Sequence, residues 1–405
     1  MSAALETRVL PSPTSLVTSP AHESVTRMKA LPLTALMDEL HRRQAHHPMW
    51  ESRLLQAFRA GALDRDDLRF VFSQYFLYSR NFTRYVAAVM ANCESDYFRA
   101  KLSENLWEEG GGCEPERRHA QIFRNFLTRA LGITSLEDIV YEDFTKLFVR
   151  EYLQRCLTAS PLVGAAFLSL GTEGIVARLY EPFVQGLLEA GLPEADLEFF
   201  RIHMECDDEH AATLEELMVS YASEPGWFDT CAAAMDDALS LRERFFESLF
   251  VAVRQRRMHG MLDRIQARAS LANEGATLTH RQGAGAVPLY TNTIERMNID
   301  FSVERFPMPA EVLDPRLVLI PAGKFNERHR HAHETFLYVL EGSGQVLIDE
   351  RVFPVQKGDA VMVPRWSIHQ TQNLGTTSMR VLAVTDFNLT EKAYVGDAKA
   401  YRQEK

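Results

Sequence analysis

The chain has 405 residues, of which 46% are hydrophobic and 24% charged, and its formal net charge at pH 7 is −11. This length suits two or three domains, and the composition is typical of a globular protein. The acidic balance argues against nucleic acid or an anionic membrane as a partner, and neither a transmembrane-length apolar run nor a secretory signal is evident.

Residues 1–27 are rich in serine, threonine and proline, which predicts a disordered arm. The five cysteines have no paired spacing. This favours reduced thiols in a cytoplasmic protein over a disulfide framework.

The pattern of residues 28–260 predicts an all-α domain. Apolar residues recur at intervals of three and four, as between Leu68 and Tyr78, and the glycine and proline breakers stand between such segments. We expect seven or eight helices in a compact bundle. The candidate helix starts are Asp64 or Asp66 for one helix, and Ser135 with Glu137 and Asp138 for another.

One short polar run in this domain has the spacing of a metal half-site. His203, Asp207 and His210 stand at i, i+4 and i+7, so on a helix they share one face. Two imidazoles and a carboxylate in this arrangement suit a first-row transition metal. The alternative is a solvated polar face, because Glu205 and Glu209 in the same run are also charged.

Three further residues complete a candidate di-metal set. Glu109 lies near a helix end, and His119 lies about one turn into a helix that restarts at Pro115. Glu173 falls on an apolar helical face, where a carboxylate is costly to bury unless it is paired or metal-bound. Each could instead be structural, Glu173 for example as a partner of Arg178. Together the six residues suit two Fe or Mn ions held between facing helices.

Residues 261–285 lose apolar periodicity and predict a linker, and residues 286–395 predict a β-domain. Short β-rich runs separated by turns favour a small barrel or jelly roll. The expected strands are Arg316–Ile320, Thr335–Leu340, Gly344–Ile348, Ala360–Val363 and Met379–Val384.

The β-domain carries a second histidine set. His329 and His331, two apart on a strand, face the same interior, and His369 should reach the same cavity. Three neutral ligands leave open positions for O2 and substrate on Fe(II). His333 falls on the same face by alternation, but we leave it out of the set. The alternative is a domain without metal that binds a ligand or dimerises.

The spacing around these histidines resembles the two motifs of the cupin family. The matching segments are Gly323-x5-His329-Arg330-His331 with Gly342, and Gly358-x5-Pro364-x4-His369-x3-Asn373. Thr335 stands where the family has its usual glutamate, and Glu334 is one position away, which favours a three-histidine site. Trp366 occupies a position that the motif usually gives to glycine.

The helical domain resembles the haem-oxygenase-like di-iron oxidases and oxygenases over residues 35–250. The resemblance rests on the order of the six candidate ligands and on the segments Gln74–Tyr85 and Asn105–Gly110. It implies a di-iron centre that activates O2. The implied ligands are Glu109, His119, Glu173, His203, Asp207 and His210.

One departure from that family concerns a further metal-binding glutamate of its N-oxygenating members. The corresponding position falls near Thr83, and no acidic residue lies between Asp67 and Glu94. The missing glutamate favours other di-iron oxidations over N-oxygenation.

The whole chain is thus expected to be an all-α haem-oxygenase-like bundle followed by a cupin β-barrel. This order of domains is similar to that of the N-nitrosourea-forming enzymes of streptozotocin biosynthesis, which implies a bifunctional, O2-dependent non-haem iron oxygenase acting on a small nitrogen-containing metabolite. The expected cofactors are a di-iron Fe(II) centre and a mononuclear cupin Fe(II), with O2 as co-substrate. An external electron donor or reductase and a homodimer are further expectations.

Two other functions remain open. The first is a di-iron desaturase or C–C lyase acting on an amino or fatty acid, with an accessory cupin. The second is a metal- or metabolite-sensing binding protein, which would bind its ligand without consuming O2.

Overall fold

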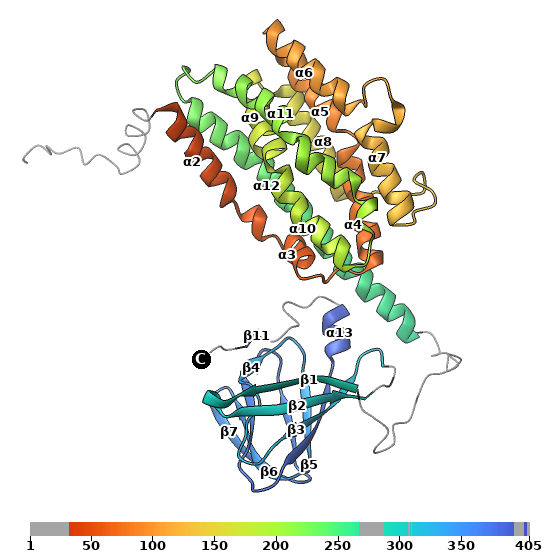
Figure 1. Cartoon of the computed structure of the whole chain (residues 1–405), viewed down its shortest axis with the longest axis vertical. Coiled ribbons are helices and arrows are strands. Elements are labelled where there is room, and N and C mark those ends of the chain that lie inside the picture. The colour runs from red at the N-terminus through yellow and green to blue at the C-terminus, as the bar shows by residue number, and fades with distance from the viewer. Residues whose placement is uncertain (1–31, 267–286, 307, 309, 393–400, 403–405) are drawn as a thin grey trace, which may run out of the picture. The chain divides into compact units, whose positions relative to one another are not determined.

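The structure is a computed structural model, and it describes residues 32–266, 287–306, 308, 310–392 and 401–402 (Figure 1). Within these ranges the side chains of residues 205–209, 264–266, 392 and 401–402 are not described. The expected arm and residues 267–285 of the expected linker lie outside the described residues, whereas residues 261–266 belong to the last helix of the bundle. The chain divides into two compact units, residues 1–250 and 251–405.

Eleven α-helices lie between residues 32 and 266, more than the seven or eight that we expected. Short helices of seven residues, which carry little periodicity, account for part of the difference. The last helix runs past residue 260, the expected end of the domain. The helices are α2 (Leu33–Ala45), α3 (Arg53–Arg59), α4 (Arg65–Ser79), α5 (Phe82–Asn92), α6 (Asp96–Glu109), α7 (His119–Asn125), α8 (Asp143–Thr158), α9 (Pro161–Gly171), α10 (Val176–Glu189), α11 (Glu198–Ser220) and α12 (Trp227–Gln266).

Side-chain caps explain where several helices begin. The Asp64 carboxylate accepts hydrogen bonds from the first turn of α4, and Asp67 reciprocates, which forms a capping box. The prediction of a cap at this position is therefore confirmed. The predicted start at Ser135 is wrong, because α8 begins at Asp143 and residues 131–142 form bends, a turn and irregular backbone. A serine followed by acidic residues is a weak signal where no apolar stripe follows it.

Aromatic rings fix the position of α11 in the bundle. Phe72 of α4, Phe126 of the π-helical turn Phe126–Ala130 and Phe200 of α11 meet with ring centroids 5.1–5.4 Å apart at steep angles. All three rings are buried. Edge-to-face packing of this kind adds about 0.5–1.5 kcal/mol per pair beyond burial. It therefore holds α11 in one rotation, and this determines where the helix points His203.

One stretch, Pro161–Glu189, is long and apolar enough to cross a membrane by length and composition, which differs from our reading of the sequence. It comprises α9, a short break and α10. The structure buries 78% of its most apolar window inside the fold. Core helices pass the same test, so the stretch is weak evidence for a membrane span.

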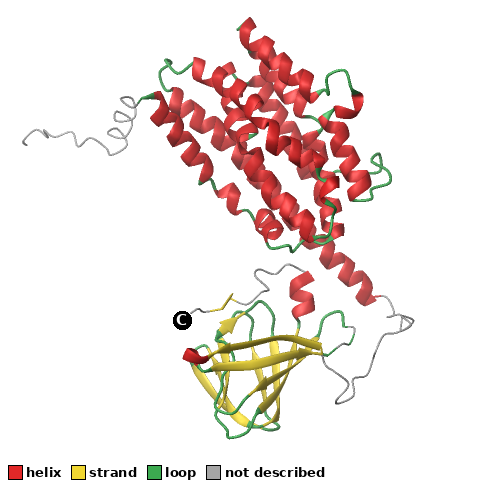
Figure 2. Cartoon of the chain, in the orientation of Figure 1, coloured by secondary structure: helices red, strands yellow, loops and turns green. Residues whose placement is uncertain are grey.

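The second unit is built from antiparallel strands in two sheets (Figure 2). One sheet has the order β1-β2-β3-β10-β5-β8, and the other has the order β11-β4-β9-β6-β7. The strands are β1 (Val287–Ile294), β2 (Ile299–Arg305), β3 (Asp314–Ile320), β4 (His329–Arg330), β5 (Thr335–Glu341), β6 (Ser343–Ile348), β7 (Arg351–Gln356), β8 (Ala360–Val363), β9 (His369–Asn373), β10 (Met379–Thr385) and β11 (Tyr401–Arg402), with one helix, α13 (Phe387–Lys392).

Alternating burial makes this unit a barrel with a filled interior. Along β10 every second residue is buried, from Met379 to Thr385, as expected for a strand with one face inward. Valine and isoleucine side chains from both sheets form its core. All five strands predicted from the sequence are present, within one or two residues of the expected ends. The fold class, a helical bundle followed by a cupin barrel, is confirmed.

Candidate metal centres

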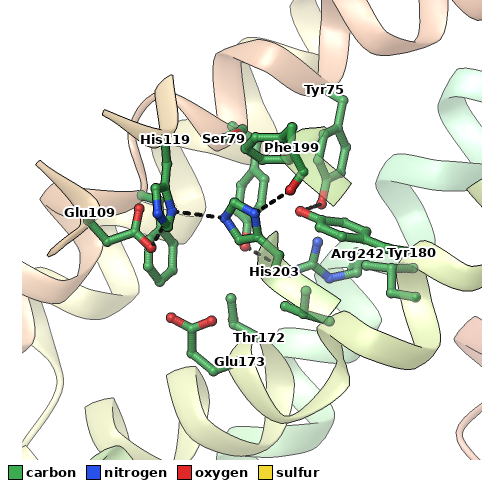
Figure 3. Close-up of a pocket in the computed structure, with 14 residues that line it drawn as sticks. Tyr75, Ser79, Glu109, His119, Thr172, Glu173, Tyr180, Phe199, His203 and Arg242 are labelled. Carbon is green, nitrogen blue, oxygen red and sulfur yellow. Dashed lines mark hydrogen bonds and ion pairs between the residues drawn. The ribbon is translucent and has the colours of Figure 1, made fainter. Parts of the chain in front are cut away.

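The helical unit brings Glu109, His119, Glu173 and His203 to the wall of one cavity (Figure 3). Glu109 is the last residue of α6, and His119 is the first of α7. Glu173 opens the 3-10 turn η4 (Glu173–Ile175), and His203 lies on α11. Segments far apart in the sequence thus converge on this cavity. The side chain of Asp207 lies outside the described residues.

Two of these residues have a different local setting from the one expected. Pro115 starts a 3-10 turn, η2 (Pro115–Arg117), so His119 opens its helix rather than lying one turn into it. Glu173 does not lie on a continuous helix, because α9 ends at Gly171. Its side chain is nevertheless buried. Arg178, the alternative partner, donates to the Ala45 carbonyl instead.

The ligand atoms of Glu109, His119 and His203 all lie within 4.8 Å of one another. His119 Nδ1 is 3.0 Å from Glu109 Oε1 and 3.1 Å from His203 Nε2. One proton on His119 Nδ1 cannot serve both neighbours well. A cation at the centre of the three would satisfy all of them, since each offers a lone pair.

Burial and hydrogen bonding keep two of these groups in the form that binds metals. His203 Nδ1 lies 2.6 Å from the Phe199 carbonyl, which fixes the proton there and leaves Nε2 free as a ligand. Burial lowers the pKa of His203 to about 4, so the ring is neutral at pH 7. Burial opposes ionisation of Glu109, yet the hydrogen bond from His119 keeps the pKa of Glu109 below its ordinary value.

His210 also lies near the Glu109 carboxylate. Its Nδ1 is 3.8 Å from Glu109 Oε1 and is buried without a hydrogen-bond partner among the described residues. Its Nε2 lies 2.8 Å from Glu108 Oε2, a contact that the sequence did not suggest. The same carboxylate oxygen, Glu109 Oε1, therefore lies near an Nδ1 atom of both His119 and His210.

The cavity has a volume of about 30 Å³, which is room for about two water-sized groups. Tyrosine and phenylalanine rings and Arg242 of α12 complete its wall. Sequence reasoning missed Arg242. The available signal was an arginine that interrupts the apolar stripe of Ala238, Phe245 and Leu249 on α12.

The cupin unit brings its three expected ligands together at the ends of β4 and β9. His329 pairs with His369 across these strands, and His331 follows β4. Their ring centroids are 4.3–5.3 Å apart, and their ligand atoms lie within 4.8 Å of one another. The three rings therefore line one small space, as the alternation argument predicted.

Each of these three rings is held by its Nδ1 and presents its Nε2. The Nδ1 atoms of His329, His331 and His369 lie 2.9–3.0 Å from the backbone carbonyls of Glu327, His333 and Ser367 respectively. Burial lowers the pKa of His331 and His369 to about 3, so both rings are neutral at pH 7. Three fixed imidazoles form a ligand set for a divalent transition metal.

The neighbouring residues that we left out of the cupin set have other partners. The His333 ring stacks on His331 at 3.5 Å and 10°, face to face. Glu334 points to Arg365, with 3.6 Å between Oε2 and Nη2, and its side chain is 55% exposed.

Trp366, in the glycine position of the motif, has φ +63°, the left-handed conformation that explains why the motif favours glycine.

Comparison with known proteins assigns both units to families. Residues 69–243 match a family described as iron-containing redox enzymes, and residues 316–385 match the cupin domain family. The chain carries a haem-oxygenase-like iron redox enzyme domain and a C-terminal cupin domain. The iron redox domain contains the segments that carry all six ligands predicted for the helical unit, and the cupin match contains the three histidines.

Three known proteins illustrate these similarities. A 4-aminobenzoate synthase of Chlamydia pneumoniae is 23% identical over 190 residues, which is 46% of this chain and 82% of that protein. A 4-aminobenzoate synthase of Chlamydia trachomatis is 27% identical over 168 residues, 40% of this chain and 70% of that protein. A crystallised cupin 2 conserved barrel domain protein from Rhodopseudomonas palustris is 29% identical and covers 25% of this chain and 70% of its own, with a TM-score of 0.23.

Proposed function

We propose that this protein is a bifunctional, O2-dependent non-haem iron oxygenase acting on a small nitrogen-containing metabolite. The observation that carries the proposal is the presence of two separate ligand sets in one chain. One consists of Glu109, His119 and His203, and the other of three histidines in the barrel. The matched families, iron-containing redox enzymes and cupins, support iron as the metal.

The donor set of the helical unit fits two iron ions. Glu109 supplies a negative charge near both His119 and His210, and the buried Nδ1 of His210 has no hydrogen-bond partner among the described residues, so it could bind a second ion. Glu173 and Asp207 are the proposed remaining ligands. Bound iron would supply the activation of O2. The protein's part is to hold the imidazoles neutral and oriented and to surround them with apolar rings that limit access by water.

The donor set of the cupin fits one iron ion. Three Nε2 atoms converge, and the nearby carboxylate of Glu334 is turned toward Arg365. A three-histidine set leaves coordination positions for small molecules. We propose that this second site acts on the product of the first, by further oxidation or by a rearrangement that forms an N–N bond, as in the N-nitrosourea-forming enzymes.

The names of two relatives support chemistry on a nitrogen-containing small molecule. Both are called synthases of 4-aminobenzoate, so the compound in the name is their product, and it carries both nitrogen and a carboxylate. We extend to this chain the chemical class, not that compound. A small-molecule substrate, an external electron donor, a homodimer and a cytoplasmic location complete the proposal.

A second candidate is a di-iron desaturase or C–C lyase with an accessory cupin. The observation that favours it is the composition of α5, which contains Thr83 and no acidic residue. Phe82, next to that position, lines the cavity. A further carboxylate ligand from this helix is thus missing, and N-oxygenating family members are expected to have one.

Mass spectrometry under ¹⁸O2 separates these functions. The iron-loaded full chain would be incubated with amines, guanidines and amino acids, together with a chemical reductant. The proposal predicts O2 uptake and a product that contains ¹⁸O on nitrogen. Loss of two hydrogens or of a carbon fragment would instead support the second candidate, and binding without O2 uptake would support a sensor. His203→Ala should abolish the reaction, whereas replacement of the exposed His41 should not.

A further inference from the structure

Arg242 is a buried cation at the wall of the helical unit's cavity. Its side chain is 1% exposed, and it lines the cavity together with Glu109, His119 and His203. Figure 3 shows its guanidinium on the side of His203 away from Glu109. Any anion bound by Arg242 from within the cavity would therefore lie beside the candidate iron ligands.

The guanidinium has unused hydrogen-bonding capacity. Nη2 donates to the Tyr78 hydroxyl at 2.8 Å, and the group lies 4.9 Å from the centre of the Tyr78 ring. Nε and Nη1 are buried and have no hydrogen-bond partner among the described residues. No carboxylate among the described residues forms an ion pair with Arg242.

The surrounding phenols do not neutralise this charge. Burial raises the pKa of Tyr75 to about 12 and the pKa of Tyr152 well above its ordinary value, so both remain protonated at neutral pH. Arginine itself stays charged in proteins. A fully buried charge without a counter-ion is costly, and such groups are found where a ligand supplies the opposite charge.

We propose that Arg242 binds the carboxylate of the substrate and holds the substrate beside the His203 cluster. The inference rests on the proposed function and narrows its substrate to small nitrogen-containing carboxylic acids. The planar guanidinium fork matches the two oxygens of a carboxylate.

Acetate and acetamide are suitable probes, because they have the same shape and differ in charge. Binding of labelled acetate to the iron-loaded full chain would be measured by equilibrium dialysis at constant ionic strength, with acetamide as the neutral comparison. The variants are Arg242→Gln, Arg242→Lys and, as a matched control, Arg244→Gln, which changes an exposed arginine on the same helix.

The inference predicts that acetate binds and acetamide does not. Arg242→Gln should weaken acetate binding about 10- to 100-fold, as for loss of a charged hydrogen bond. Arg242→Lys should weaken it less, and Arg244→Gln should leave it unchanged. Equal acetate binding in the wild type and Arg242→Gln, or no acetate binding to the iron-loaded wild type, would overturn the inference.

A second measurement guards against misfolding of the variants. In wild-type protein labelled with ¹⁵N-arginine, the Nε–H resonance of Arg242, assigned by its absence in Arg242→Lys, should shift with acetate and not with acetamide. The metal-free, diamagnetic chain serves for this titration. An unmoved Arg242 resonance would contradict the inference even if Arg242→Gln does not fold.

The two proposals fail in different ways. Iron bound at the expected ratio together with no effect of acetate at Arg242 would remove the inference and leave the oxygenase. An acetate effect at Arg242 in a chain that takes up no iron would remove the oxygenase and leave an anion-binding cavity.

Discussion

Residues in both ligand sets share one feature, an imidazole tethered through Nδ1 to a backbone carbonyl. His203 in the helical unit and His329, His331 and His369 in the barrel all have Nδ1 within hydrogen-bond distance of a backbone carbonyl. Such a tether selects one tautomer and fixes the direction of the free lone pair. The conformational entropy of these side chains is thus lost when the chain folds, before any metal binds.

Glu109 and Glu108 offer a matched test at adjacent positions. Glu109→Gln removes the carboxylate charge next to His119 and His210 and should weaken iron binding to the helical unit by about 100-fold or more. Glu108→Gln keeps an oxygen that can accept the hydrogen bond from His210 but removes its negative charge, and should weaken iron binding about tenfold, the lower end of the effect of outer-sphere partners. Iron titrations of the two variants measure the difference, and equal effects would argue against Glu109 as a ligand.

The cupin histidines predict how the stability of the metal-free chain depends on pH. Burial holds the pKa of His331, His333 and His369 at about 3, whereas in the unfolded chain it is about 6.5. Below pH 6.5 the unfolded state therefore binds more protons than the folded state, and stability should fall as the pH falls toward 3. The slope should approach about 4 kcal/mol per pH unit for three groups, and stability should be flat above pH 7.

Urea-dependent hydrogen exchange of strands β5 and β10 would measure this dependence in the cupin unit itself. His331→Gln should reduce the slope, and replacement of the exposed His259 should not. A cupin unit that gains stability on acidification from pH 7 to pH 5 would contradict the assigned burial.

At the scale of elements, the ligands lie where regular structure stops. Glu109 ends α6, His119 begins α7 and Glu173 lies in the break between α9 and α10. The sequence predicted the break between Glu109 and His119 but not the break at Glu173, because Glu173 also fits the apolar face of a continuous helix. The break depends on packing: a Cβ on Gly171 would lie 2.3 Å from Ala238 Cβ of α12, a contact invisible in the local sequence.

Gly174→Ala tests whether this break positions Glu173. A Cβ at this position would meet the Ser169 carbonyl oxygen at 2.8 Å, and a backbone atom cannot move aside cheaply. We expect a loss of about 1–3 kcal/mol in stability, in the range of overpacking, and weaker iron binding by the helical unit. Urea unfolding and iron content measure the two effects. Unchanged iron affinity in a destabilised variant would separate Glu173 from the metal site.

Trp366→Gly tests the strain in the second cupin motif. Trp366 adopts a left-handed conformation that costs a residue with a Cβ about 1–2 kcal/mol. Glycine removes that cost but loses more entropy on folding, so we expect a net gain of up to about 1 kcal/mol. Trp366→Ala keeps the strain and should give no gain. A loss of stability with glycine as large as with alanine would show that the exposed indole makes compensating contacts.

For the whole molecule, the sequence was enough to predict the order of the two domains, the five main strands and the histidine clusters. These features depend on local spacing: alternation along β10, and the two-residue interval between His329 and His331. Arg242 and the contact of Glu108 with His210 depend on residues more than a hundred positions apart, so no local pattern reports them. The short strands β4 and β9, which pair His329 with His369, were not predicted as strands. The sequence indicated only that the histidine motifs lie there.

Iron content of single-site variants tests the central claim that two separate ligand sets each hold iron. The full chain, loaded with Fe(II) without oxygen and desalted, should retain two iron ions in the helical unit and one in the barrel. His203→Ala should lose the iron of the helical unit and keep that of the barrel, and His329→Ala should do the reverse. A chain that retains no iron, or variants that both lose all of it, would contradict this account.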